Sequence, residues 1–346
     1  MTTIATLHTA HPRAFALDPA DLDGLESYLR ARLWITPWAS VQRAERAGDG
    51  NMNLTLRVET TTGSLIVKQG RPWVEKYPTI AAPWGRIAVE GACYEIARRL
   101  PATAQGTPAL IGVDEESQIL AVEDLGPAAD FAGVYQGGAI ASQEVESLAA
   151  WLAAFHDAPV PPAHRQRLGN HAMRALNHEY IFHQPLRSGA EAGLDAVCPG
   201  LAALAGAMRR DTRLVEEMAG LGRRYLSDGD GLAHGDFFPG SWLRAPDGPR
   251  VIDFEFAFLG EVEFDLGVMV AHLHLAHQPS LVALALDTYG ARRGFERPLV
   301  ARYAGAEILR RVLGVAQLPL LSGLDHRRAA LELARALVCG ERDVAA

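Results

Sequence analysis

The hydrophobic pattern divides the chain near residue 125. Before that point, apolar and polar residues alternate in short runs, and a period of two is typical of β-strands with one buried face. A Gly-Asp-Gly-Asn turn, Gly48 to Asn51, separates the first two runs. The pattern therefore predicts an antiparallel sheet with a glycine-rich tip. The runs are 41–47, 52–59, 64–68, 109–113 and 118–122.

After residue 126 the period changes to that of helices. Val145, Leu148, Leu152 and Phe155 form an apolar stripe at helical steps. This change divides the chain into two regions of different character. Before the boundary, helices are expected at 21–33 and 86–100, and after it at 170–182, 201–226, 264–277, 280–290, 298–316 and 325–345.

One stretch between the predicted strand 64–68 and the predicted helix 86–100 has no clear period. Residues 70–84 contain two tryptophans, a tyrosine and three prolines, which predicts irregular structure. A lid over a ligand and a packed Ω-loop both fit this composition.

The stretch 231–265 carries the densest candidate chemistry. A turn at Pro246-Asp247-Gly248, between alternating apolar residues, predicts a β-hairpin. Asp236 and Ser241 precede the hairpin, and Asp253 and Glu255 follow it. Because a hairpin brings its ends together, we expect these oxygen ligands to converge. Converging oxygens suit Mg²⁺ and a phosphate-bearing substrate.

Phosphoryl transfer explains why two separate carboxylates are present. The protein mainly positions groups and neutralises charge in this reaction. Asp236 in the His-x-Asp loop is placed to take the proton of an attacking hydroxyl. Asp253, at the end of an apolar strand, is placed to hold the metal, with Ser241 as a neutral second ligand.

Other interpretations of the same residues remain open. Asp and Ser in a turn-rich loop often only cap turns. His234 and Asp236 also fit a metallohydrolase, which would act without ATP. Lys68 at a strand end is often a solvated charge. Asp265 fits the N-cap of the next helix, and the three histidines at 272, 274 and 277 lack the spacing of a metal site.

Composition narrows the classes of partner. The 346 residues are 49% hydrophobic with a net charge of −8, which argues against a nucleic-acid or anionic-membrane surface. Three distant cysteines indicate buried thiols in a reducing compartment. No secretory signal and no run of about 20 apolar residues is evident. We expect a soluble cytoplasmic protein with a small-molecule substrate, and leave a homodimer open.

The motifs resemble those of the aminoglycoside phosphotransferase and choline kinase superfamily. They are His234-Gly235-Asp236, Gly240-Ser241 and Asp253-Phe254-Glu255, preceded by the strand Leu65-Ile66-Val67-Lys68-Gln69. Gly-Ser and Asp-x-Glu are similar to the methylthioribose kinase branch, as is the segment around Arg310-Arg311. The resemblance implies an α+β, two-lobed protein-kinase-like fold. It places a nucleotide-binding N-lobe of antiparallel sheet plus helix at residues 1–125, and a mainly helical catalytic and substrate C-lobe at residues 126–346.

The resemblance also implies a role for each matching residue in an ATP-dependent kinase that uses Mg²⁺. Asp236 would be the catalytic base, and Asp265 would bond the catalytic-loop backbone. The metal ligands would be Asp253, Ser241 and Glu255. The nucleotide would be bound by Lys68 with its partner Glu90, the glycine loop (Gly48, Gly50, Asn51) and the hinge (Glu123, Leu125). The acceptor would be bound by His234, Arg310 and Arg311.

The identity of the acceptor is the least determined point. The resemblance implies 5-methylthioribose or a related pentose, and twin arginines favour a neutral or anionic acceptor. Phe237-Phe238-Pro239, Phe254 and Gln317 depart from that branch near the acceptor site. The alternatives are an aminoglycoside or choline/amino-alcohol phosphotransferase, and a nucleotide-binding module without activity.

Overall fold

The computed structural model describes residues 4–48, 52–189, 193–318, 320 and 323–345. The chain forms two compact units. The first contains the described residues up to Pro127 together with Phe254–Phe256, and the second contains Ala128–Asp253 and the residues from Ala257 onward. The sequence boundary at residue 125 lies near this division, but the return of Phe254–Phe256 to the first unit was not expected.

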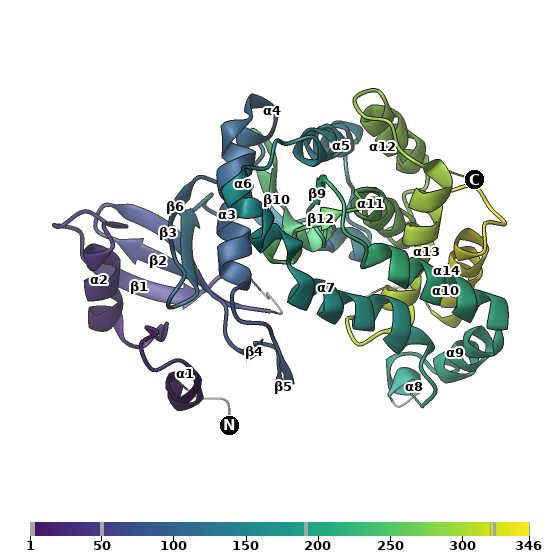
Figure 1. The fold of residues 1–346 in the computed structure, drawn as a ribbon, viewed down its shortest axis with the longest axis horizontal. Helices are drawn as coiled ribbons and strands as arrows, with labels where there is room; N and C mark the ends of the chain where they lie inside the picture. The colour runs from purple at the N-terminus through teal and green to yellow at the C-terminus, as the bar shows by residue number, and fades with distance from the viewer. Residues whose placement is uncertain (1–3, 49–51, 190–192, 319, 321–322, 346) are drawn as a thin grey trace. The chain divides into compact units, whose positions relative to one another are not determined.

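The first unit is built on a five-stranded antiparallel sheet, as the alternation predicts (Figure 1). Each strand pairs with a neighbour close in the chain, except that β3 (Gly63–Gln69) pairs with β7 (Ile119–Glu123). In spatial order the strands are β1 (Val41–Arg46), β2 (Leu54–Thr60), β3 (Gly63–Gln69), β7 (Ile119–Glu123) and β6 (Leu110–Asp114).

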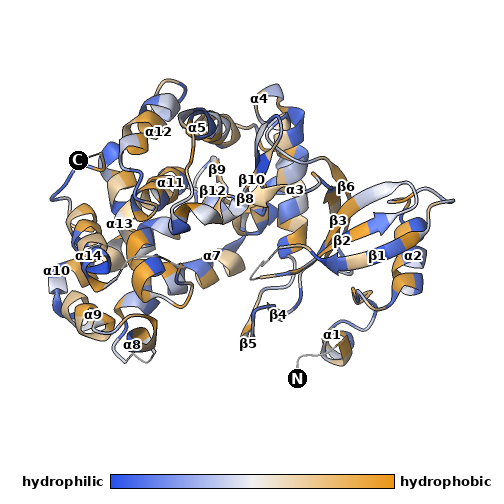
Figure 2. Cartoon of the chain, turned by 180° about the vertical axis from the view of Figure 1, so that it is seen from behind, coloured by the Kyte–Doolittle hydropathy of each residue, from blue (hydrophilic) through white to orange (hydrophobic). Residues whose placement is uncertain are grey.

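Two helices flank this sheet. The helix α2 (Leu22–Ala31) packs its apolar residues against Leu56, Val58 and Val67 to form a buried core. Figure 2 shows hydrophilic and hydrophobic residues alternating along α2, as expected for a helix with one buried face. The helix α3 (Arg86–Arg99) contacts β6 and β7. Because neighbours in a strand point to opposite faces, Lys68 points away from the side that holds Val67.

The stretch 70–84 is more regular than its composition predicts. It contains a short hairpin of β4 (Trp73–Val74) and β5 (Tyr77–Ala81). Both residues of β4 are buried, so the packing of an aromatic and an aliphatic side chain outweighs the breaking tendency of the flanking prolines. Two further helices of this unit are α1 (Ile4–Ala10) and α4 (Pro101–Ala104).

The second unit is mainly helical. The central helix α11 (Glu263–Leu275) is apolar around almost its whole circumference and is buried between α12 (Ser280–Gly290) and α13 (Arg297–Leu313). The predicted helix 201–226 is two helices, because Asp211 accepts a hydrogen bond from the Leu214 N–H and starts a new one. The helices are α5 (Ser142–His156), α6 (Pro162–Arg165), α7 (His171–His178), α8 (Leu194–Val197), α9 (Leu201–Arg210), α10 (Thr212–Tyr225), α11 (Glu263–Leu275), α12 (Ser280–Gly290), α13 (Arg297–Leu313) and α14 (Leu324–Val338).

Short strands in this unit frame the motif region. The predicted hairpin is present: β10 (Trp242–Ala245) pairs with β11 (Gly248–Val251), and β8 (Ala129–Asp130) lies on the other side of β10. A second pair joins β9 (Gly231–Ala233) to β12 (Phe258–Gly260). After α7 the helix widens into a π-helical turn, Glu179–His183.

Within the described part of the chain, every helix is too short or too polar to span a bilayer.

Candidate active site

The candidate catalytic loop begins where the buried strand β9 ends. Leu232 and Ala233 are fully buried, so the strand is fixed by its packing. Gly235 then adopts φ +84°, a left-handed conformation that glycine reaches without strain. Its carbonyl accepts a hydrogen bond of 3.0 Å from Asn177 Nδ2. The backbone that precedes Asp236 is therefore fixed by the buried strand and by the hydrogen bond from Asn177.

Asp265 holds the same loop through its carboxylate. Oδ2 accepts from the His234 N–H at 2.5 Å, and Oδ1 accepts from the Gly235 N–H at 2.9 Å. His156 Nε2 lies 2.9 Å from Oδ2. The N-cap of α11 is Val262 and not Asp265, so that expectation is wrong. The backbone contact that the resemblance implies is present.

His234 is fully buried inside the loop. Its Nε2 bonds the carbonyl of Ile252 at 2.9 Å, and its Nδ1 accepts from the Asp236 N–H at 3.3 Å. Burial lowers the pKa of His234, and the charge of Asp265 opposes that shift. We expected His234 to contact the acceptor, whereas this placement favours positioning of Asp236.

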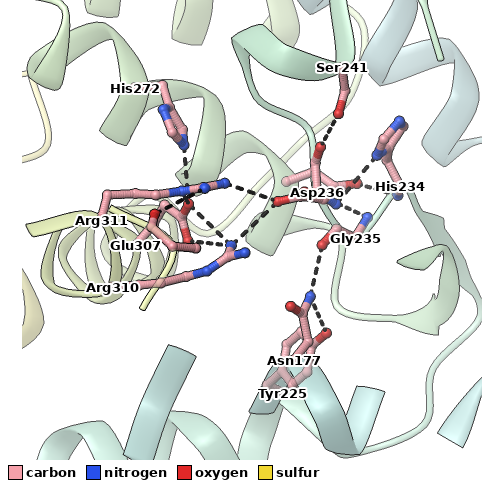
Figure 3. A network of polar contacts seen from close by, with 12 residues as sticks. Asn177, Tyr225, His234, Gly235, Asp236, Ser241, His272, Glu307, Arg310 and Arg311 are labelled. Carbon is pink, nitrogen blue, oxygen red and sulfur yellow. Dashed lines mark hydrogen bonds and ion pairs between the residues drawn. The ribbon is translucent and has the colours of Figure 1, made fainter. Parts of the chain in front are cut away.

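The carboxylate of Asp236 faces both predicted arginines (Figure 3). Its Oδ1 lies 3.3 Å from Arg310 Nη1 and 3.3 Å from Arg311 Nη2. Adjacent residues on a helix point about 100° apart, yet both long side chains reach one oxygen. We expected the pair near the acceptor, and its contact with Asp236 was not anticipated.

Glu307 completes this cluster and was missed in the sequence. Its carboxylate accepts from Arg310 Nη1 at 3.1 Å and from Arg311 Nε at 2.6 Å. Although burial raises the pKa of Glu307, the two guanidinium groups outweigh it and lower the pKa overall. The spacing of three and four residues to a pair of arginines on one helix was the available signal.

Behind Glu307 lies a buried histidine. His272 Nε2 is 3.1 Å from Glu307 Oε1, and its Nδ1 bonds the hydroxyl of Tyr135. Burial lowers the pKa of His272 to about 4, which the bond to Glu307 opposes and the charge of Arg311 reinforces. The imidazole is therefore neutral near pH 7 and orients Glu307 without adding charge.

Ser241 and Asp253 lie beside the loop, at the two ends of the hairpin. The Ser241 hydroxyl donates to the Asp236 carbonyl at 2.9 Å, and the Ser241 carbonyl accepts from the Ile252 N–H at 3.0 Å. Asp253 follows with φ +67°. The carboxylates of Asp236 and Asp253 both raise the pKa of His234 electrostatically, though burial outweighs them. The hairpin thus brings these three predicted residues into one neighbourhood.

In the first unit, Lys68 and Glu90 form the expected ion pair. Lys68 Nζ lies 3.0 Å from Glu90 Oε1 and 2.9 Å from Oε2, and both side chains are buried. An ion pair taken out of water needs good geometry to persist, and the alternation of β3 supplies it by pointing Lys68 toward α3. This placement favours a functional lysine over a solvated edge charge.

The other predicted nucleotide contacts are less defined. Gly48 has φ +71° beside the glycine-rich turn, while Gly50 and Asn51 lie outside the described residues. Glu123 ends β7, and its N–H donates to the carbonyl of Ala109 at 2.8 Å. Leu125 follows in the connection to the second unit. The role of these positions in nucleotide binding stays a prediction.

Glu255 belongs to the first unit and has partners there. Its Oε2 accepts from Asn53 Nδ2 at 2.9 Å and from Arg86 Nε at 3.0 Å. The structure thus brings Asp236, Ser241 and Asp253 together, whereas the Glu255 carboxylate is held by residues before and within α3.

The described residues include no group of three or more His, Cys, Asp or Glu side chains placed to hold a metal ion. Mg²⁺ usually takes one or two protein carboxylates and completes its shell with water and substrate phosphates. The carboxylate of Asp253 and the hydroxyl of Ser241 are hard oxygen donors of that kind. These residues fit Mg²⁺ shared with a phosphate substrate, and they do not fit a metal held by the protein alone.

The chain is similar in sequence to known phosphotransferases. Residues 43–301 match the model of the phosphotransferase enzyme family. A methylthioribose kinase of Exiguobacterium sibiricum is 26% identical, with 85% of this chain and 87% of the relative covered. One of Geobacillus kaustophilus is 27% identical, with 85% and 86% covered.

Comparison with solved structures supports the kinase-like fold. Spectinomycin phosphotransferase, solved in complex with ADP and spectinomycin, has a TM-score of 0.59 at 14% identity over 91% of this chain and 98% of that one. A choline/ethanolamine kinase family protein from Mesorhizobium loti has a TM-score of 0.51 at 16% identity, covering 90% and 94%. The predicted two-lobed α+β kinase class is confirmed. From the family match, together with these relatives, it follows that this chain belongs to the phosphotransferase enzyme family and is a kinase of a small molecule.

Proposed function

We propose that this kinase transfers the γ-phosphate of ATP to a hydroxyl of a neutral, sugar-like acceptor, methylthioribose or a related pentose. The relatives named methylthioribose kinase cover most of the chain and support this acceptor class. The use of ATP agrees with the kinase family and with the ADP found in the solved relative.

The observation that carries the proposal is the charge balance around Asp236. Two guanidinium groups, Arg310 and Arg311, face two carboxylates, Glu307 and Asp236. His272 adds no charge near pH 7, because burial lowers its pKa to about 4. An aminoglycoside or choline is cationic. Its positive charge would lie near two guanidinium groups whose charge the two carboxylates only balance. A neutral polyol instead gains hydrogen bonds without disturbing this balance.

In the proposed reaction Asp236 takes the proton of the acceptor hydroxyl, whose oxygen then attacks the γ-phosphorus while ADP leaves. Both arginines contact Oδ1, so we assign proton transfer to Oδ2. Asp253 with Ser241 would hold Mg²⁺, which supplies charge neutralisation on the phosphates when bound. Lys68, oriented by Glu90, would contact the phosphates of ATP.

An ADP-release assay with different acceptors tests the proposal. The acceptors are methylthioribose, ribose, other pentoses, kanamycin and choline, each with ATP and Mg²⁺. We expect kcat/KM for one neutral sugar to exceed that for the cationic acceptors by about 100-fold or more. Faster turnover of kanamycin or choline than of every neutral sugar would assign the chain to the aminoglycoside or amino-alcohol alternative. Absence of ADP release with all acceptors would indicate a module without activity.

A further inference from the structure

The carboxylate of Glu255 already has two hydrogen-bond donors inside the first unit. Asn53 Nδ2 lies 2.9 Å and Arg86 Nε lies 3.0 Å from the same oxygen, Oε2. Arg86 Nε also lies 2.9 Å from Asn53 Oδ1, which closes a three-membered ring of contacts. The side chain of Arg86 is 0% exposed and that of Glu255 is 6% exposed. This ring is therefore a buried ion pair with an amide bridging it.

The rest of the Arg86 guanidinium binds main-chain carbonyls. A guanidinium has five N–H donors in a rigid fork, and here both terminal nitrogens are used. The acceptors come from the segments on either side of hairpin β4–β5 and from the residue after the glycine-rich turn. They are Arg71 O at 2.8 Å, Pro83 O at 2.9 Å and Met52 O at 3.2 Å.

The space around the guanidinium is matched to its size. Gly70 packs against it, and a Cβ at that position would lie 3.3 Å from Arg86 Cζ and 2.9 Å from a side-chain carbon of Ile87. Burial lowers the pKa of Arg86, and the charges of Glu255 and Glu90 oppose that shift. Glu255 is therefore the contact carboxylate that makes a buried positive charge tolerable at this point.

We propose that Glu255 is the counter-ion of Arg86 and not a ligand of Mg²⁺, and that Arg86 is a positioning residue for the nucleotide site. It ties three segments: the Asp-x-Glu motif, Met52–Asn53 after the glycine-rich turn, and the base of hairpin β4–β5. The statement that Glu255 is not a ligand of Mg²⁺ rests on the proposed function. The statement that it is the counter-ion of Arg86 rests on the contacts alone.

The physical reason is competition for one carboxylate. To bind a cation, Glu255 would have to weaken its bonds to Asn53 and Arg86, which would leave a buried guanidinium without its ion pair. We therefore assign Glu255 to the support of this backbone and not to the metal.

The first experiment needs neither metal nor nucleotide. Thermal unfolding of Glu255→Gln is measured in EDTA, and we expect Tm to fall by about 5 °C or more, because an uncompensated charge is left buried. Glu255→Gln combined with Arg86→Met should lose less than the two single changes added together. Arg13→Gln, whose side chain is 88% exposed, serves as the control and should leave Tm unchanged.

The second experiment separates metal binding from positioning. In a Mg²⁺ titration of activity, Glu255→Gln should keep the half-saturating concentration within about twofold of the parent, whereas Asp253→Asn should raise it about tenfold or more. The KM for ATP should rise about tenfold in Glu255→Gln while the KM for the acceptor stays the same. Asn53→Ala, which keeps the ion pair, should show the same KM pattern more weakly and replaces Glu255→Gln if that variant does not fold.

Two outcomes would overturn the inference. One is an unchanged Tm for Glu255→Gln in EDTA. The other is a tenfold rise in its Mg²⁺ requirement, which would make Glu255 a metal ligand. Absence of activity in the parent protein would instead contradict the proposed function, and the measurement in EDTA would still decide whether Glu255 is the counter-ion.

Discussion

Each unit contains a buried cluster of arginine and carboxylate side chains, and the two clusters differ in how completely they are satisfied. In the first unit Arg86 is 0% exposed, and all three of its side-chain nitrogens have acceptors. In the second unit the Asp236 side chain is 17% exposed. There, among the residues that the structure describes, Arg310 Nε is buried without a hydrogen-bond partner.

On the proposed function, this difference separates a structural framework from the catalytic site. A fully satisfied buried cluster gains rigidity and offers nothing to a ligand. A cluster with an accessible carboxylate and an unsatisfied donor still has capacity for a hydroxyl and a phosphate. Similar residue types therefore have different roles, and burial together with hydrogen-bond completeness distinguishes them.

The largest effect is expected at Asp236, the most accessible side chain of the second cluster. Asp236→Asn keeps the shape of the side chain but removes the proton acceptor. We expect kcat to fall about 10²–10⁴-fold with little change in Tm, measured by ADP release and thermal unfolding. Asp247→Asn, a 73% exposed carboxylate in the same hairpin region, is the control. Full activity of Asp236→Asn would remove the distinction drawn between the two clusters.

Glu307→Gln tests whether the second cluster must stay charge-balanced. The substitution leaves both arginines to compete for Asp236, which shifts the base from its aligned position. We expect kcat/KM for the acceptor to fall about 100-fold, with Glu307→Asp recovering part of it. Glu216→Gln, an exposed glutamate on α10, should behave as the parent. A Glu307→Gln enzyme with parental kinetics would show that the arginines need no shared carboxylate.

His272 gives the second cluster a pH dependence of stability. Burial lowers its pKa from 6.5 to about 4, so between these values the unfolded chain binds the proton and the folded chain does not. Stability therefore falls as the pH drops from 7 to 5, by about 2 kcal/mol from this residue.

The measurement compares urea unfolding at pH 7 and pH 5. His272→Asn should lose roughly that part of the difference, because the titrating group is gone. His171→Asn, whose side chain is 73% exposed, should keep the parental difference. An unchanged pH dependence in His272→Asn would mean that other groups, such as the buried His234, account for it.

The smallest effect is expected at a surface pair with similar chemistry. Arg297 makes two bonds of 2.9 Å to the Asp343 carboxylate, but both side chains are about half exposed. Solvent screens such pairs, so Arg297→Ala should change the unfolding free energy by about 0.5 kcal/mol or less. A loss as large as that of Glu255→Gln would show that geometry matters more than burial in this protein.

Local sequence rules predicted the elements that position the site. Alternation located β2 and β3, and the Pro-Asp-Gly turn located the hairpin that brings Ser241 near Asp253. These features depend on residues close in the chain or on a period that the chain itself displays. The Lys68–Glu90 pair was implied only by the family resemblance, because local rules favour a solvated charge for a lysine at a strand end.

The missed features depend on partners far apart in the sequence. Glu255 bonds a residue 202 positions earlier, and no local pattern indicates that contact. Glu307 looks like an ordinary helical glutamate until the fold brings Asp236 against its arginines. The hairpin at 70–84 forms because its first strand is buried, which composition alone does not reveal.

The left-handed backbone at Asp253 limits which residues can replace the aspartate during evolution. Aspartate, asparagine and glycine tolerate φ near +67°, whereas β-branched residues there are strained. Asparagine or glycine would preserve the fold and remove the negative charge in one step. The position can therefore lose its carboxylate without losing its backbone conformation. On the proposed metal role of Asp253, one substitution would then turn an active kinase into an inactive one.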